Sequence, residues 1–369
     1  MKSILICSIR LIGDVILTTP LIYLLKKKYP DAKIDILVAS GTGSFLERDP
    51  RIRRVLTVPS NQVVEQKPDR PGYTTLPQLF HEYDIAITMN ASDRGNLVAI
   101  FAGKKARIGF YENNGLLKSG WRRMLLTVPL YYDTSEHVVM HSRQVAEALG
   151  IDAEKLEVSV YWNDEDRDKI VRSLALGRSQ QQYFVIHPFA RWEYKYWNLD
   201  SFVNLSDLIA RKYALTPVWT SSPDPAECEG LRKYADKCSI KPKIIAGTFS
   251  LNQMACLIAG ASLYIGLDTA VTHIAASTGV PVVALYGPTE TYRWFPWNNS
   301  GAIDQMRQCS RGTHRNGKIV LIQKECQHTH CIRPGCTDIC MKRISVEEVF
   351  EAVGVLLHET GHSESSANA

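Results

Sequence analysis

The stretch that decides the fold is residues 263–290, LYIGLDTAVTHIAASTGVPVVALYGPTE. An apolar run at 263–267 is followed by a lone Asp268, a stretch of small residues with helical character, and a second apolar run that ends in a glycine turn. Two buried strands joined by a crossover helix have this pattern, which is typical of a parallel sheet. We therefore predict a strand–helix–strand unit in which Asp268 stands where the first strand ends.

The same alternation of short aliphatic runs and helical stretches extends through the chain of 369 residues, with the first helix expected over 13–30. It is interrupted by a polar, charge-rich segment at 151–182, which we interpret as a linker. A chain of this length exceeds what one hydrophobic core usually supports. We expect an α/β protein with two Rossmann-like domains and a ligand cleft between them. The expected parts are an N-terminal domain, a C-terminal domain, and a final helix crossing back to the N-terminal domain before a disordered tail, at 1–165, 183–344 and 345–369.

Composition and charge narrow the class of protein. The formal net charge of +5 is too small to indicate nucleic-acid binding, but it is compatible with an anionic substrate or a lipid surface. The sequence contains no run of about 18 apolar residues, so we expect no transmembrane helix. Arg10 and Gly13-Asp14 interrupt the apolar N-terminus, which favours a buried strand over a signal peptide. We therefore expect a cytoplasmic protein whose nine cysteines are thiols or metal ligands rather than disulfides.

Two interpretations of Asp268 follow from its position. Asp is a favoured N-cap, so Asp268 either only caps the next helix or belongs to an anion site. In the second case, the free amide groups and positive dipole end of the helix bind a pyrophosphate beyond the carboxyl end of the strand. His273 follows on the first turn of the helix, within reach of the same phosphates. The residues alone leave both interpretations open.

Three motifs, in order along the chain, resemble those of the lipopolysaccharide heptosyltransferases. The first is IRLIGDVILTTPLI, with Gly13, Asp14 and Pro20; the second is HPFARWEYKYWNLDSF at 187–202; the third is the turn at 268–273 and the later Gly-Pro-Thr. The resemblance implies two Rossmann-like domains whose parallel sheets face an interdomain cleft, the GT-B arrangement. It also implies an inverting glycosyltransferase that moves heptose from ADP-heptose to a Kdo- or heptose-bearing lipopolysaccharide inner core.

Two residues are the catalytic candidates. Asp14 follows the first strand, and the resemblance makes it the general base that accepts the proton of the acceptor hydroxyl; an N-cap is the alternative role. A single displacement with one base implies inversion at the anomeric carbon. Lys195 is the candidate for neutralising the diphosphate, because an ammonium is a compact charge; a solvated loop lysine is the alternative.

The resemblance also implies a donor-binding set. Glu227 is expected at the ribose, with Glu229 as a rival, and Phe249 is expected against the adenine unless it is a core aromatic. We expect no cofactor and no required metal, because the helix N-terminus and Lys195 supply positive charge. The string Asp164-Glu165-Asp166 is interpreted as a helix start rather than a metal site. The donor-binding candidates are Gly13, Arg191, Lys195, Glu227, Phe249, Asp268, Thr269, Ala270 and His273.

The acceptor side is marked by basic residues between 94 and 123. The stretch 109–126, which contains several of them, is interpreted as a long loop. A solvated basic face is one interpretation. The family's acceptor favours contact with a phosphorylated, lipid A-linked core, and a peripheral location at the cytoplasmic face of the inner membrane. The acceptor-binding candidates are Arg94, Lys104, Lys118, Arg122 and Arg123.

A cysteine cluster near the C-terminus offers zinc ligands at Cys326, Cys331, Cys336 and Cys340. The spacing lacks the two-residue knuckle that is common in structural zinc sites, so we expect no metal there.

Three alternative functions are each compatible with part of the sequence. The first is a glycosyltransferase that uses another nucleotide sugar, and the second is a zinc-containing, non-enzymatic nucleic-acid module. The third is a nicotinamide dehydrogenase, but the turn at Gly41 and Gly43 lacks the third glycine of the dinucleotide motif. We expect no nucleic-acid partner.

Overall fold

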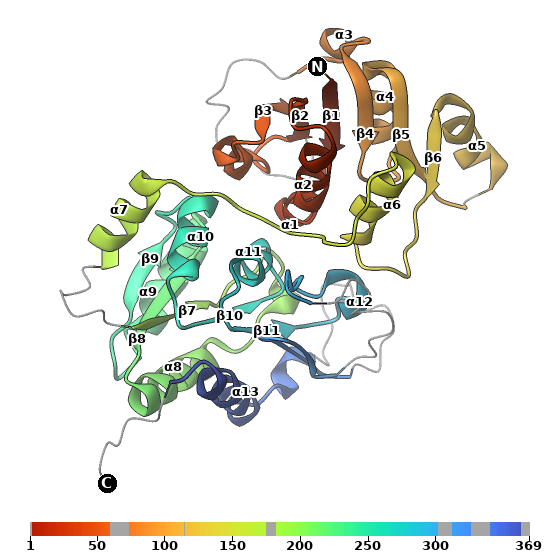
Figure 1. Ribbon diagram of the computed structural model, residues 1–369. Helices are drawn as coiled ribbons and strands as arrows, with labels where there is room; N and C mark the ends of the chain where they lie inside the picture. Colours follow the sequence, from red (N-terminus) through yellow and green to blue (C-terminus); the bar gives the residue numbers. More distant parts are fainter. Residues whose placement is uncertain are drawn as a thin grey trace. The chain divides into compact units, whose positions relative to one another are not determined.

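The computed structural model describes residues 2–59, 74–113, 115–174, 182–301, 312–325 and 340–362, apart from the side chains of 116–119. The chain divides into two compact units, Met1–Tyr161 and Trp162–Ala369. Each unit is a sheet with helices packed on it (Figure 1). Within the described ranges, no helix is both long enough and apolar enough to cross a membrane.

The first unit contains a sheet in which all the strand pairings are parallel. The order across the sheet is β3-β2-β1-β4-β5-β6, so the strand order reverses between β1 and β4. In doubly wound sheets, ligands bind at the carboxyl ends of the strands beside such a reversal. The strands are β1 (Ser3–Ser8), β2 (Lys33–Ala39), β3 (Ile52–Val58), β4 (Tyr83–Thr88), β5 (Gly103–Tyr111) and β6 (Val128–Tyr131).

The helical segments of the first unit differ from the sequence prediction in two places. The helix expected over 13–30 is broken, because Pro20 has no N–H to donate to the carbonyl of Ile16; the Thr19 hydroxyl donates to it instead, at 2.7 Å. The loop expected over 109–126 contains a helix, α5. The segments are α1 (Ile12–Ile16), α2 (Thr19–Lys28), η1 (Ser44–Arg48), α3 (Leu76–Leu79), α4 (Asp93–Ala102), α5 (Leu116–Leu125) and α6 (Met140–Ala148).

The second unit contains a sheet of order β12-β13-β11-β10-β7-β8-β9, parallel except for the β12–β13 pair. Its strand order reverses between β7 and β10. The predicted α/β class, with two Rossmann-like sheets, is therefore confirmed. The strands are β7 (Tyr183–His187), β8 (Thr216–Ser221), β9 (Lys243–Ala246), β10 (Leu263–Leu267), β11 (Val282–Tyr286), β12 (His314–Asn316) and β13 (Ile319–Gln323).

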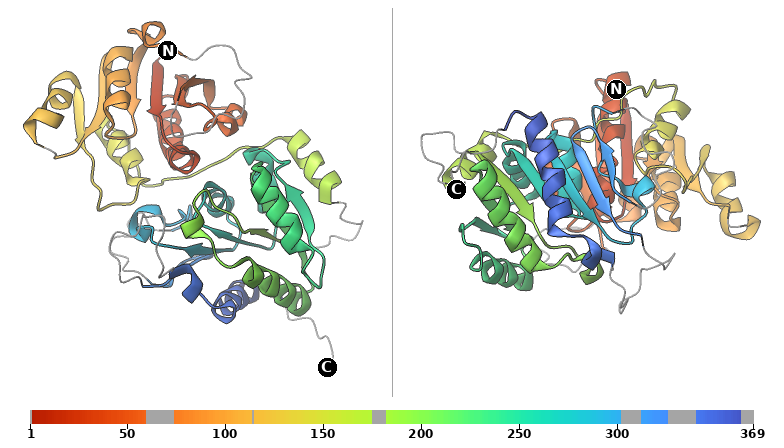
Figure 2. Two further views of the ribbon diagram at one scale, coloured as in Figure 1. Left: turned by 180° about the vertical axis from the view of Figure 1, so that it is seen from behind. Right: turned by 90° about the horizontal axis from the view of Figure 1, so that it is seen from below.

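Helices cover both faces of the second sheet (Figure 2). One face packs on α8, α9 and α13, and the other packs on α7, α10 and α11. The helical segments are α7 (Asp164–Leu174), η2 (Glu193–Lys195), α8 (Leu199–Tyr213), α9 (Pro225–Ala235), α10 (Leu251–Ala259), α11 (Ala270–Thr278), α12 (Thr291–Trp294), η3 (Cys340–Arg343) and α13 (Val346–Glu359).

One prediction about the second unit is wrong and another is incomplete. The helix expected to cross back to the N-terminal domain is α13, which instead packs on α8 and buries Val349 and Val353 in the core of its own unit. The boundary between the units, after Tyr161, lies inside the segment expected as a linker over 151–182, but this segment also contains α7, which packs on α10 and buries Ile170 and Leu174. In both cases the apolar stripe of a helix finds its partner inside the second unit.

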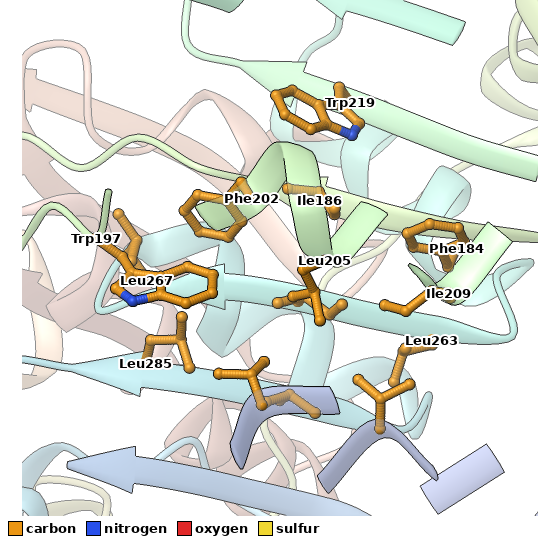
Figure 3. Packing of buried hydrophobic residues seen from close by; sticks show 14 of the residues in the cluster. Phe184, Ile186, Trp197, Phe202, Leu205, Ile209, Trp219, Leu263, Leu267 and Leu285 are labelled. Atoms are coloured by element: carbon orange, nitrogen blue, oxygen red, sulfur yellow. The ribbon is translucent and has the colours of Figure 1, made fainter. Parts of the chain in front are cut away.

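Trp197 anchors the loop that follows β7. Figure 3 shows its ring in the core beside Phe202, Leu267 and Leu285. The Trp197 and Phe202 rings meet edge to face with centroids 4.8 Å apart, and the Trp197 indole N–H donates to the carbonyl of Ile344 at 2.9 Å. Because Trp197 lies two residues after Lys195, this packing restricts where the lysine backbone lies.

Candidate active site

Lys195 and Asp268 meet at the carboxyl edge of the second sheet. Lys195 ends η2 in the loop after β7, and Asp268 directly follows β10. The Lys195 Nζ lies 2.5 Å from Asp268 Oδ2, and the two side chains are only 17% and 8% exposed. Since β7 and β10 are paired at the reversal of strand order, this ion pair lies where doubly wound sheets bind ligands.

Asp268 does not cap the helix that follows it. The N-cap of α11 is Thr269, in extended backbone conformation, while the Asp268 carboxylate accepts hydrogen bonds from Lys195 and from the Thr289 hydroxyl. Thr289 lies in the loop after β11. The capping interpretation is therefore wrong, and three neighbouring strands each place one side chain in a Lys195–Asp268–Thr289 cluster.

Buried polar contacts fix the backbone around this cluster. The Thr272 hydroxyl donates to the carbonyl of Leu267 at 2.5 Å, which ties α11 to the end of β10. The Gln323 amide donates to the carbonyls of Gly287 and Thr289 at 2.5 and 2.9 Å. These bonds hold both flanking loops, so the cluster is supported by the sheet and not by flexible side chains alone.

His273 lies on the first turn of α11 and is buried. Burial lowers the pKa of its imidazole to about 4, with the Asp268 carboxylate opposing and Lys195 reinforcing this shift. The ring is therefore neutral at pH 7. Within the described residues, His273 Nδ1 is buried without a hydrogen-bond partner. This nitrogen therefore has hydrogen-bonding capacity that the described contacts do not use.

The predicted ribose and adenine residues lie on neighbouring elements. Glu227 is half-buried in the first turn of α9, and its Oε2 accepts from the Ser222 amide at 3.0 Å. Burial raises the pKa of the Glu227 carboxyl. Its rival Glu229 is exposed. Phe249 is partly buried against the core, with the Lys169 Nζ 5.2 Å from its ring centroid.

The remaining donor candidates are less concentrated. Arg191 is exposed, with its guanidinium 5.1 Å from the centroid of the Trp192 ring. Ala270 is the first residue of α11, beside the cluster. Gly13, in contrast, belongs to α1 of the first unit, whereas the other donor candidates lie in the second.

A small pocket opens at the carboxyl edge of the first sheet. β1 and β4 run in parallel up to Cys7 and Thr88, so the residues that follow them emerge side by side at the reversal of strand order. Asp14 comes from α1, after β1, and Asn90 follows β4. The pocket is lined by Ser8, Arg10, Asp14, Leu17, Thr18, Met89, Asn90, Tyr132, Val138 and His141.

Asp14 lies in the first turn of α1, whose N-cap is Leu11, so the alternative that Asp14 caps this helix is wrong. The Arg10 Nε lies 3.1 Å from Asp14 Oδ1, with the side chains 42% and 18% exposed. Burial opposes the charge of Arg10, but the Asp14 carboxylate outweighs it and the pKa of Arg10 is raised. Asp14 is therefore a carboxylate at a pocket wall, in contact with a permanent cation.

The predicted acceptor residues do not form one surface. Lys104 is the second residue of β5, whereas Arg123 lies 5.2 Å from the ring of Tyr111 at the other end of that strand. Seven residues of extended chain separate these two levels by roughly 23 Å. The grouping of Lys104 with the others is therefore wrong, because sequence proximity ignores the direction of the strand.

The other basic candidates lie toward the carboxyl edge. Arg122 pairs with Asp93 at 2.5 Å and is 9% exposed, and Arg94 Nη1 donates to the carbonyl of Pro59 at 2.7 Å. The side chain of Lys118 is outside the described part of the structure. Arg123 is the exposed candidate on α5.

The cysteine cluster, where no metal is expected, lies mostly outside the described residues. Cys326, Cys331 and Cys336 lie outside the described residues, and Cys340 is a buried thiol in η3. In the described ranges, no group of three or more His, Cys, Asp or Glu side chains is placed to hold a metal ion.

The acidic string before α7 has a structural role. Asp166 N donates to Asn163 Oδ1 at 3.0 Å, and Asn163 N donates to Asp166 Oδ2 at 3.2 Å. This reciprocal pair is a helix-start arrangement. The interpretation of the string as a helix start is confirmed.

Sequence reasoning assigned no site role to three participants: Thr289 in the cluster, which it named only within the Gly-Pro-Thr motif, and Arg10 and Asn90 in the pocket. The signal for Thr289 was its place after a strand that runs parallel to β10. Asn90 also follows a strand, but the strand order that puts it beside Asp14 is not readable from the sequence.

Comparisons with known proteins identify the family of this chain. Residues 77–319 match the model of glycosyltransferase family 9 (heptosyltransferase). Lipopolysaccharide heptosyltransferase 3 of Escherichia coli is 30% identical over 292 residues, which cover 78% of this chain and 84% of that protein.

Two solved structures share the fold. ADP-heptose lipopolysaccharide heptosyltransferase II of E. coli has a TM-score of 0.71 at 20% identity, covering 98% of this chain and 99% of its own. E. coli heptosyltransferase WaaC with ADP-2-deoxy-2-fluoro heptose has a TM-score of 0.63 at 16% identity, covering 96% and 99%.

Proposed function

This chain belongs to glycosyltransferase family 9, the heptosyltransferases, and from this we propose that it transfers heptose from ADP-heptose to a Kdo- or heptose-bearing inner core of lipopolysaccharide. The observation that carries the proposal is the Lys195–Asp268–Thr289 cluster at the strand-order reversal of the second sheet. A lysine held at this position beside a helix N-terminus is suited to a diphosphate.

Lys195 and α11 take the diphosphate in this proposal. The ammonium has three N–H donors, and one of them reaches Asp268. The other two are left for phosphate oxygens, and the N-terminus of α11 adds the positive end of its dipole. Asp268 positions the lysine, and neutral His273 adds a hydrogen-bonding nitrogen. These groups stabilise the charge that develops on the leaving ADP without a metal ion.

Asp14 is the general base. The acceptor hydroxyl oxygen forms a bond to the anomeric carbon while its proton passes to the Asp14 carboxylate. The bond from that carbon to the diphosphate oxygen breaks, and ADP leaves with the electron pair. One displacement of this kind inverts the anomeric configuration. Arg10 keeps the carboxylate oriented through the contact at 3.1 Å.

The acceptor is proposed to reach the first unit from the cytoplasmic face of the inner membrane. Support comes from α5, where Arg123, Met124 and Leu125 are exposed, the last two by 85% and 48%. A helix end that combines a cation with exposed apolar side chains suits an anionic lipid interface.

The test is a panel of nucleotide sugars assayed against lipopolysaccharide acceptors truncated at successive core sugars. The proposal predicts transfer from ADP-heptose, and not from UDP- or GDP-sugars, to an acceptor that ends within the inner core. Transfer from a different nucleotide sugar would replace the donor assignment. Absence of transfer to any core acceptor would contradict the acceptor assignment.

A further inference from the structure

Asn90 carries a buried hydrogen-bond donor that the fold does not use. The residue is 5% exposed and lines the pocket that contains Asp14. Within the described residues, its Nδ2 has no hydrogen-bond partner. A buried donor without an acceptor is costly, so such a group calls for a partner from outside the fold, either a bound water or a ligand.

The orientation of the Asn90 amide is set by its other end. Asn90 Oδ1 accepts from the Ser92 amide N–H at 3.0 Å, so a flipped amide would place two donors against each other. Gly95 permits this arrangement, because a Cβ there would lie 2.4 Å from Thr88 Oγ1 and 3.1 Å from Asn90 Oδ1. The Nδ2 group is therefore directed away from the start of α4.

A neighbouring asparagine shows the contrast. Asn96, on α4, donates from its Nδ2 to the carbonyls of Ser92 and Phe110 at 3.0 and 2.9 Å. Its amide hydrogens are spent on the fold, and it is not among the residues that line the pocket. Asn90 and Asn96 thus provide a matched pair, with one amide donor unused and the other used.

We propose that Asn90 is an acceptor-binding residue, whose amide donates to the sugar hydroxyl adjacent to the one that Asp14 deprotonates. The inference rests on the proposed function. Asp14 accepts a hydrogen bond and Asn90 donates one, so together they suit two neighbouring hydroxyl groups, a vicinal diol. The apolar side chains of Leu17, Met89 and Val138 complete the pocket and can contact the C–H face of a sugar ring.

The test compares the substitutions Asn90→Ser and Asn96→Ser in the full chain. Serine at position 90 can still accept from the Ser92 amide but lacks the Nδ2 group. Asn90→Ser should raise the acceptor KM by about tenfold, the value of one hydrogen bond. It should leave the ADP affinity and the thermal midpoint near those of the wild type. Asn96→Ser should lower the thermal midpoint.

A deoxy acceptor gives a second readout. Calorimetry measures the binding of two ligands to the wild type and to Asn90→Ser. One ligand is O-deacylated core oligosaccharide, and the other is an analogue that lacks the hydroxyl next to the transfer position. The analogue should bind the wild type about tenfold more weakly and lose nothing further with the variant. This inference is overturned if the wild type binds both oligosaccharides equally well, or if Asn90→Ser has an unchanged acceptor KM. In either case, heptose transfer by the wild type would still support the proposed function. If the wild type neither binds nor glycosylates the core, both fail.

Discussion

Lys195 and Asp268, 73 positions apart in the sequence, form an ion pair of 2.5 Å at the carboxyl edge of the second sheet, where the strand order reverses. Lys195 follows β7 and Asp268 follows β10, the two strands paired at that point. The ion pair therefore holds the Lys195 ammonium beside the N-terminus of α11. In our account, the diphosphate binds to these two groups.

Asp14→Asn should reduce turnover by about 10²–10⁴-fold, because the amide cannot accept the acceptor's proton. The affinity for ADP should stay within about twofold of wild type, since the groups assigned to the diphosphate lie in the second unit. Loss of the Arg10 contact should cost little stability, about 0.3–0.5 kcal/mol for an exposed i,i+4 pair.

The control for this prediction is Asp152→Asn, an exposed aspartate in the same unit. Steady-state kinetics with saturating donor and acceptor give the comparison. Near-normal turnover in Asp14→Asn would remove Asp14 from the role of base.

Chelation should leave transfer intact. Lys195 and the α11 N-terminus supply the positive charge in our proposal, so initial rates with excess EDTA should lie within about twofold of those with added Mg²⁺. Restoration of a lost rate by one divalent ion, and not by another, would establish a metal requirement and contradict this part of the mechanism.

Acid should destabilise the second unit between pH 6.5 and 4. Burial lowers the pKa values of His187 and His273 to about 4, below the usual 6.5, so the unfolded chain binds more protons than the native one in this window. Stability is therefore complete above pH 6.5 and is lost as the pH falls, by about 1.4 kcal/mol per pH unit for each histidine.

Tryptophan fluorescence in a urea titration measures this effect, because every tryptophan except Trp121 belongs to the second unit. His187→Asn should show a shallower pH dependence than the wild type, since one titrating group is removed. A urea midpoint that does not change between pH 7 and pH 5 would show that the two imidazoles are not kept neutral by burial.

The architecture of the cluster was largely predictable from the sequence. Apolar runs before Asp268 and before the Lys195 loop indicated parallel strands, whose carboxyl ends share one edge of a sheet. The contact between the two side chains was not predictable, because it depends on which strands are adjacent. For the same reason Thr289 entered only as part of a motif.

Lys104 and Asn90 show opposite failures of sequence reasoning. Proximity in the sequence groups Lys104 with Arg122 and Arg123, yet β5 carries Lys104 to the other edge of the sheet. Asn90 gives no signal in the sequence, because a lone asparagine after a strand carries no charge or motif. Its importance follows only from burial, an unused donor and a strand pairing, which are properties of the folded chain.

Calorimetric titration of ADP into the wild type, Lys195→Ala and Lys237→Ala tests the central claim most directly. Lys237 is a matched control, an exposed lysine of the same unit paired with Asp200 at 2.7 Å. Our account predicts that Lys195→Ala weakens ADP binding by roughly ten- to hundredfold, from the loss of a charged hydrogen bond worth about 1.5–3 kcal/mol. Lys237→Ala should bind ADP like the wild type. Equal ADP affinity in all three proteins would contradict the assignment of the diphosphate to the Lys195–Asp268–Thr289 cluster.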